Sequence, residues 1–150
     1  MKIIPYKIEA TNSTRYEFES VGPKGIIKKC VEITALKRKN TFNIGFGDMR
    51  SDSTIDDKSE TNNKDLIRVF ATVLAIMKDF MLNNPTAILY FSGSTDQRTA
   101  IYHYILKRNF TFINNEYSIT GILLVDGIPY EVVFDPTADS PFLAFLIKKK

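Results

Sequence analysis

The sequence is poor in the residues on which much protein chemistry relies: it has one cysteine, one histidine and no tryptophan. The single cysteine, Cys30, excludes an internal disulfide and a zinc site built from cysteines. The single histidine, His103, leaves no multi-histidine metal site. No apolar run reaches the roughly 18 residues that a membrane span needs, and the start MKIIPYKIEA becomes polar too early for a secretory signal. We therefore expect a cytoplasmic protein that does not enter a membrane.

What the chain does have is the composition of a folded domain. Its 150 residues are 44% hydrophobic and 25% charged, which supplies a core and excludes wholesale disorder. This length predicts a single domain over residues 1–150. The net charge is only +3, and basic residues gather in the first forty positions. The lysines and arginine of residues 24–39 permit weak nucleic-acid contact, but a solvated strand face accounts for them more simply, so nucleic acid is not the expected partner.

Hydrophobic periodicity predicts strands near both ends of the chain and helices in the middle. The predicted strands cover residues 15–20, 26–36, 41–46, 87–91, 118–125, 128–134 and 142–147, and the predicted helices cover residues 66–82 and 95–108. Asp126-Gly127 between two strands is typical of a hairpin with a primed turn. The expected architecture is an α/β (α+β) fold with one mixed, mostly antiparallel sheet in the order βββ-α-β-α-βββ and two packed helices.

The clearest functional motif lies at residues 92–99, where a buried strand gives way to the second helix. The first N–H groups of a helix lack partners and its dipole is positive there, so anions bind well. A glycine permits close backbone approach, hydroxyls donate hydrogen bonds, and an arginine can form a fork with phosphate or carboxylate. The candidate site for a small anionic ligand, a phosphate or nucleotide, therefore consists of Gly93, Ser94, Thr95, Arg98 and Thr99.

Plain helix capping is the alternative explanation of that motif. Ser94 would then cap the helix, and Arg98 would pair with an acid such as Asp48 or Asp57 and hold the long polar loop 49–64. The motif is not a Walker loop, because the second glycine and the lysine are missing.

Acidic residues around the 49–64 loop raise the question of a metal site. Asp48, Asp56, Asp57 and Asp65 offer the oxygen ligands that Mg²⁺ and Ca²⁺ prefer. Their spacing does not fit a calcium-binding loop, and the central glycine is absent. We therefore expect solvated loop acids, with Asp65 in the first turn of the helix, and no metal site.

Three further candidates have structural explanations. His103 stands between Tyr102 and Tyr104 and could do acid–base work, but adjacent helical residues point in different directions. Ser92 lacks the complete nucleophile-elbow pattern of hydrolases. Cys30 falls in the middle of a strand and is expected to be a small core residue.

Several motifs resemble a family of small uncharacterised bacterial proteins across nearly the whole chain. They include Gly45-Phe46-Gly47-Asp48 and Gly93-Ser94-Thr95-Asp96-Gln97-Arg98-Thr99, a GFGD…GSTxxRT pattern. This resemblance implies no activity.

More distantly, the order of elements resembles the N-acetyltransferase-like fold. Arg98, Ala100, Tyr104 and Asn109-Phe110 echo the helix signature of that fold. The resemblance implies acetyl-CoA as cofactor and Tyr102 or Tyr104 as general acid. That fold normally holds the pyrophosphate in a glycine-rich turn, whereas residues 48–92 of this chain contain no glycine.

The sequence therefore favours a non-catalytic binding or interaction module without a cofactor, with an anion site at residues 92–99. An acyl-CoA-dependent N-acyltransferase with a degenerate CoA-binding loop is the first alternative. Weak nucleic-acid binding through the basic strand 24–39 is the second.

Overall fold

The structure is a computed structural model that describes residues 4–52, 55–56, 65–92, 96–139 and 141–150, without the side chains of residues 56, 96–98 and 101. In this part of the chain the helices are α1 (Leu66–Asn83), α2 (Asp96–Arg108) and α3 (Phe110–Asn114). The strands are β1 (Glu9–Asn12), β2 (Arg15–Gly22), β3 (Gly25–Ala35), β4 (Thr41–Met49), β5 (Ile55–Asp56), β6 (Ile88–Phe91), β7 (Tyr117–Val125), β8 (Ile128–Val133) and β9 (Ala144–Lys149). The protein is thus α+β and rich in strands.

The chain divides into two compact units, residues 1–34 with 44–84 and residues 35–43 with 85–150. Hydrogen-bonded strands follow the order β1-β2-β3-β4-β6-β9-β7-β8, with β5 paired to β4 outside this path. The order is mixed, because β4 and β6 are parallel whereas the other pairs with a determined register are antiparallel. The residues of β4 are shared between the two units.

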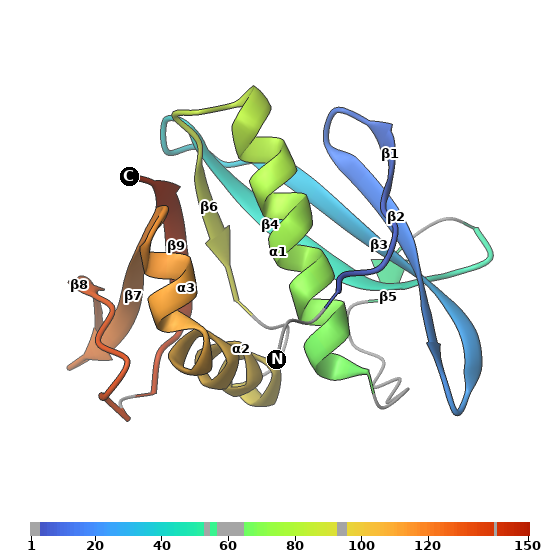
Figure 1. Ribbon diagram of the computed structural model, residues 1–150. Helices are drawn as coiled ribbons and strands as arrows, with labels where there is room; N and C mark the ends of the chain where they lie inside the picture. The colour runs from blue at the N-terminus through green and yellow to red at the C-terminus, as the bar shows by residue number, and fades with distance from the viewer. Residues whose placement is uncertain (1–3, 53–54, 57–64, 93–95, 140) are drawn as a thin grey trace. The chain divides into compact units, whose positions relative to one another are not determined.

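In the first unit, α1 packs on one face of the strands β2 to β4 (Figure 1). The apolar stripe that predicts this helix is the side that becomes buried, as expected for an amphipathic helix. The alternating residues Tyr16 and Phe18 of β2 are buried as well, and the Tyr16 hydroxyl donates a hydrogen bond of 2.9 Å to Asp79 of α1. Core residues of α1 are Val69, Phe70, Thr72, Val73, Ile76, Met77, Phe80 and Met81.

In the second unit, β6 lies between the first residues of β4 and the strand β9, and β7 and β8 follow β9. The helices α2 and α3 lie beside β7 and β9 (Figure 1). The prediction of a central strand covered on both faces is confirmed in part: β6 has a neighbour on each side and Leu89 and Phe91 are buried, whereas Ile88 and Tyr90 on the other face are only partly buried. Phe134, Phe142 and Phe145 form an aromatic cluster beside α2, with ring centroids 5.4 to 5.9 Å apart.

The predicted α+β class and mixed sheet are confirmed, but the predicted element order is incomplete. The structure adds β1, β5 and α3, so the described residues contain nine strands and three helices where seven strands and two helices are expected. All four residues of β1 are exposed, β5 has two residues and α3 has five, so none carries a readable hydrophobic period. Whether residues 1–150 act as a single domain stays a prediction.

Candidate functional sites

The predicted anion site lies mostly outside the described residues. β6 ends at Phe91 and α2 begins at Asp96, so a strand does pass into a helix N-terminus where the sequence predicts it. Thr99, in the first turn of α2, is buried. Gly93, Ser94, Thr95 and the side chain of Arg98 are outside the described part of the chain. The anion site therefore stays a prediction.

The two acids proposed as partners of Arg98 have different outcomes. Asp48 accepts an ion pair from the Lys29 ammonium group, across neighbouring strands of the first unit. Asp57 lies outside the described residues. The side chain of Lys29 is buried, so the prediction that this lysine belongs to a solvated strand face is wrong. The nearby carboxylate compensates its charge, which makes the burial tolerable.

Within the first unit, the neighbouring lysines of the basic segment do not share one face of β3. Lys28 stands directly opposite Glu19 in the β2–β3 pair, and Lys28 and Lys29 point to opposite faces of β3. These two neighbouring lysines therefore do not form a basic strip on one face of β3.

The three consecutive aromatic residues on α2 point in different directions, as helical geometry predicts. Tyr102 is buried and meets Phe91 edge to face at 5.6 Å between ring centroids. Tyr104 is exposed, and its hydroxyl accepts a 2.8 Å hydrogen bond from Arg108. His103 lies among phenylalanine rings, where burial lowers its pKa and the neighbouring Lys107 lowers it further. The trio therefore does not form a joint acid–base site.

Cys30 is fully buried, which confirms the expectation that it is a core residue. Burial raises the pKa of its thiol to about 11. The thiolate is the nucleophilic form of cysteine, so this residue is unreactive at neutral pH in the folded protein.

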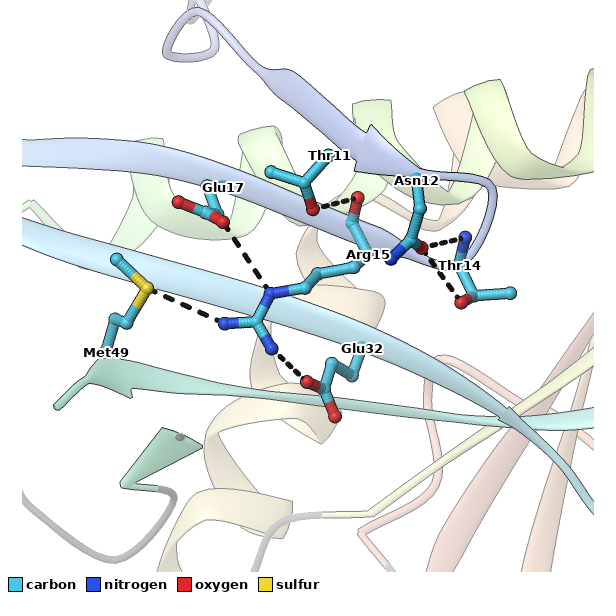
Figure 2. Close-up of polar contacts among 7 residues, drawn as sticks. All are labelled: Thr11, Asn12, Thr14, Arg15, Glu17, Glu32 and Met49. Carbon is cyan, nitrogen blue, oxygen red and sulfur yellow. Dashed lines mark hydrogen bonds and ion pairs between the residues drawn. The ribbon is translucent and has the colours of Figure 1, made fainter. Parts of the chain in front are cut away.

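A cluster of polar side chains centred on Arg15 covers the sheet face on which Cys30 lies (Figure 2). The Arg15 guanidinium lies 3.6 Å from the Glu17 carboxylate, forms an ion pair with Glu32 and donates to the Met49 sulfur at 3.6 Å. Glu17 stands directly opposite Cys30 in the β2–β3 pair. The cluster is therefore a structural cover for this part of the sheet.

Asp65 has a role that sequence reasoning did not foresee. The helix begins one residue later, and Asp65 occupies the N-cap position without a side-chain capping bond, so its placement in the first turn is wrong. Its carboxylate instead accepts hydrogen bonds from the hydroxyls of Tyr6, at 2.7 Å, and Ser20. The Tyr6 backbone N–H also donates to Thr72 at 2.8 Å. These contacts tie the N-terminal segment and β2 to α1, and no local pattern signals them, because Tyr6 and Asp65 are far apart in the chain.

Sequence reasoning also missed an apolar surface at the far end of the second unit. The β7–β8 hairpin turns at Asp126 (φ 51°) and Gly127 (φ 79°), which confirms the predicted primed turn. The hairpin exposes large apolar side chains on both of its faces, and Val133 retains 87% of its accessible surface. The exposed set is Leu124, Val125, Ile128, Tyr130 and Val133.

The outer edge of β8 carries unpaired backbone groups. β8 is the last strand in the hydrogen-bonded order, so within the described residues it has β7 as its only neighbour. Residues flanking a two-residue primed turn exchange backbone hydrogen bonds, and this pattern alternates along an antiparallel pair. Val125 and Ile128 flank the turn, so the even-numbered residues of β8 form their backbone hydrogen bonds with β7. The 3.1 Å hydrogen bond from the Phe134 N–H to the Ile119 carbonyl continues this alternation.

The odd-numbered residues Pro129, Glu131 and Val133 therefore direct their backbone groups away from β7. Proline has no N–H, and position 129 is one where the ladder to β7 needs none. The side chain of Glu131 forms an ion pair with Arg38. The edge thus offers two N–H donors and three carbonyl acceptors beside exposed apolar side chains.

Within the described part of the chain, no helix combines the length and hydropathy that crossing a bilayer requires. Among the same residues, no three His, Cys, Asp or Glu side chains come together in a way that could hold a metal ion.

These features define a small α+β protein with a buried polar network, a packed histidine and an exposed apolar hairpin. The chain belongs to DUF6934, a family of unknown function whose model matches residues 2–150. No curated protein and no solved structure matches the chain. It is therefore a domain of unknown function.

Proposed function

We propose that the chain is a non-catalytic interaction module that binds an extended segment of a partner protein along the outer edge of β8. The open edge carries this proposal, because an added strand would pair with the backbone groups of Glu131 and Val133. Apolar side chains of the hairpin flank this edge on both faces and would contact alternate side chains of the added strand.

Charge favours a basic partner segment. Asp126 and Glu131 are the only charged residues of the β7–β8 hairpin between residues 117 and 133, and both are acidic. A lysine or arginine opposite Glu131 would share its carboxylate with Arg38.

A second copy of the chain is a poorer occupant of the same edge. In the antiparallel register that brings Pro129, Glu131 and Val133 of two copies together, one Glu131 stands directly beside the other. Like charges in directly opposite positions of a strand pair are destabilising. The proposed occupant is therefore a segment with apolar residues on either side of a basic residue.

Titration with capped synthetic peptides tests this proposal. The probe alternates Val and Thr around a central Lys; one twin carries a central Glu, and another has methylated backbone nitrogens. We expect the Lys peptide to bind and to shift the amide signals of Glu131 and Val133, and the methylated twin to fail because it cannot pair with the edge. Equal binding of the methylated twin, or no binding at millimolar peptide, would overturn the proposal.

Matched charge variants sharpen the test. Glu131→Gln should weaken the Lys peptide by about two- to fivefold, the range of an exposed ion pair. Asp126→Asn, the same charge change at the turn, should leave binding unchanged, because Asn also tolerates a positive φ. Glu131→Lys should reverse the preference between the Lys and Glu peptides. Self-association that Val133→Lys abolishes would instead identify a second copy as the occupant and refute the peptide proposal.

The anion site at residues 92–99 is a second candidate, favoured by the passage from the buried strand β6 into the N-terminus of α2. A thermal-shift screen with phosphate, nucleotides and CoA should raise Tm through linkage if the site exists. Arg98→Ala should abolish the shift. Arg108→Ala, at the opposite end of the same helix, should preserve it. No shift for the wild type, or equal shifts for the wild type and Arg98→Ala, would remove this candidate.

The acetyltransferase-like fold and an acyltransferase activity with acetyl-CoA are a further proposal, carried by the accessible hydroxyl of Tyr104 on α2. Direct titration with acetyl-CoA decides it, since a transferase that does not bind this cofactor cannot act. We also propose a cytoplasmic location, because a chain with one cysteine gains no internal disulfide from an oxidising compartment.

A further inference from the structure

We propose that His103 is an acid-sensitive latch that holds Ala138, Asp139 and Phe142 against α2 while its imidazole is neutral. The proposal concerns the second unit alone and goes beyond any role of the hairpin edge.

The half-buried imidazole of His103 packs against three phenylalanine rings. Its centroid lies 4.9 Å from the ring of Phe142, 5.7 Å from that of Phe134 and 6.0 Å from that of Phe145. The rings of Phe142 and Phe134 meet it nearly at right angles. Its Nε2 atom is buried and has no hydrogen-bond partner among the described residues. A proton added at Nε2 would therefore place a donor and a charge against hydrocarbon.

The other ring nitrogen defines the tautomer. A hydrogen bond with the backbone of Ala138 favours the protonated ring, so the imidazole is the donor in that bond. Because Nε2 has no partner, Nδ1 carries the proton and Nε2 is the free basic site. The neutral ring thus donates a hydrogen bond to Ala138 and packs against apolar side chains. Protonation at Nε2 keeps the hydrogen bond but places a charge against the apolar side chains.

Two charged groups shift the pKa of His103 in opposite directions. Lys107, one turn further along α2, disfavours a charge on His103, and Asp139 favours it. Lys107 and Asp139 form an ion pair of 2.6 Å, so they largely offset each other. The other side chains in contact with the ring, those of Phe134, Phe142 and Phe145, carry no charge. Burial therefore decides the sign, and the closed latch binds a proton less readily than the open one.

Phe142 connects the latch to β7. The Phe142 ring packs directly on the backbone of Gly121. A Cβ at position 121 would lie only 2.3 Å from the Cε1 atom of Phe142. Leu143 next to it donates a 2.8 Å hydrogen bond to the Ile122 carbonyl. Moving Phe142 away would break this hydrogen bond and expose the Leu143 amide to solvent. Hydrogen exchange of the Leu143 amide therefore reports opening directly.

The pKa difference between the closed and open states determines how pH changes the equilibrium between them. The pKa of His103 is lowered in the closed state and returns toward about 6.5 when the ring is solvated. The closed state is therefore fully favoured above pH 6.5 and loses its advantage as pH falls toward the closed-state pKa. In that window the open population rises as pH falls, with a slope of at most one proton. The pKa values of Asp135 and Asp139 are lowered by their hydrogen bonds, so these carboxylates stay ionised in the same window.

Hydrogen exchange of the wild type and His103→Phe tests the latch. After correction for the intrinsic pH dependence of exchange, the Leu143 amide of the wild type should lose protection on acidification with a slope of one proton. Amides of α1 in the first unit should keep their protection, which separates local opening from global unfolding. The His103→Phe variant should show no such step. A pH-independent Leu143 amide, simultaneous loss in α1, or the same slope in His103→Phe would each overturn the proposal.

A second measurement keeps the test decisive if the variant does not fold. The chain has a single histidine, so its imidazole signals need no assignment by mutation. Nitrogen chemical shifts at high pH should report the proton on Nδ1, and the titration midpoint should lie below 6.5 and coincide with the onset of Leu143 exchange. A proton on Nε2, or a midpoint at or above 6.5, would refute the latch.

Discussion

Replacing Gly121 by alanine tests the packing of the aromatic cluster directly. The new Cβ would lie 2.3 Å from Cε1 and 2.5 Å from Cδ1 of Phe142, far inside van der Waals contact. Phe142 is buried, so its ring cannot simply swing into solvent. Overpacking of this kind costs about 1–3 kcal/mol, and alanine is intrinsically favoured over glycine in a strand by roughly 0.5–1 kcal/mol. We therefore expect a net loss of about 0–2.5 kcal/mol in the free energy of unfolding.

A double-mutant cycle with Phe142→Ala isolates the clash. Phe142→Ala alone should cost about 3–5 kcal/mol through the cavity it leaves. In that background the clash is absent, so Gly121→Ala should cost nothing or stabilise slightly. Urea unfolding of the four proteins measures the coupling. If Gly121→Ala costs the same with and without the Phe142 ring, the packing argument is wrong.

Three further predictions concern other parts of the chain. Tyr6→Phe removes a hydrogen bond to the Asp65 carboxylate and should lower the free energy of unfolding by about 1.5–3 kcal/mol in urea titrations; an unchanged midpoint would show that the bond contributes nothing. Cys30 should resist a thiol reagent at pH 8 in the folded protein and react fully in denaturant, because burial raises its pKa to about 11; rapid labelling of the folded chain would contradict this. Gly127→Ala should lower Tm, with a cost of about 1 kcal/mol for a positive φ, although a Cβ at that position would meet no atom within 4 Å; equal stability would rule out backbone strain at the turn.

Several elements follow from local patterns alone. The three- and four-residue spacing of apolar side chains predicts α1, and that stripe is the buried side of the helix. The continuous apolar run at residues 87–91 predicts a central strand covered on both faces; β6 is central in the strand order, but it is fully buried on one face only. Asp126-Gly127 predicts the primed turn, because both positions tolerate a positive φ. Each of these inferences needs only residues within a few positions of one another.

The errors arise where distant residues meet. The sequence predicts that Lys29 belongs to a solvated strand face, because it does not show that Asp48 lies beside this lysine in the folded protein. Asp65 reads as an acid of the first helical turn, yet it accepts hydrogen bonds from Tyr6 and Ser20 instead. The predicted anion site at residues 92–99 stays a prediction, because its central residues lie outside those described.

By itself, the sequence determined the α+β class, the apolar faces of the main elements and the buried state of its one cysteine. Only the tertiary structure decided which strand is the open edge, which rings enclose His103 and which hydroxyls bind Asp65. The physical reason is that periodicity reports how strongly each face avoids water, whereas strand order and register decide which faces meet. The family of unknown function to which the chain belongs adds no activity, so the edge of β8 and the neutral imidazole of His103 are the places where experiment should begin.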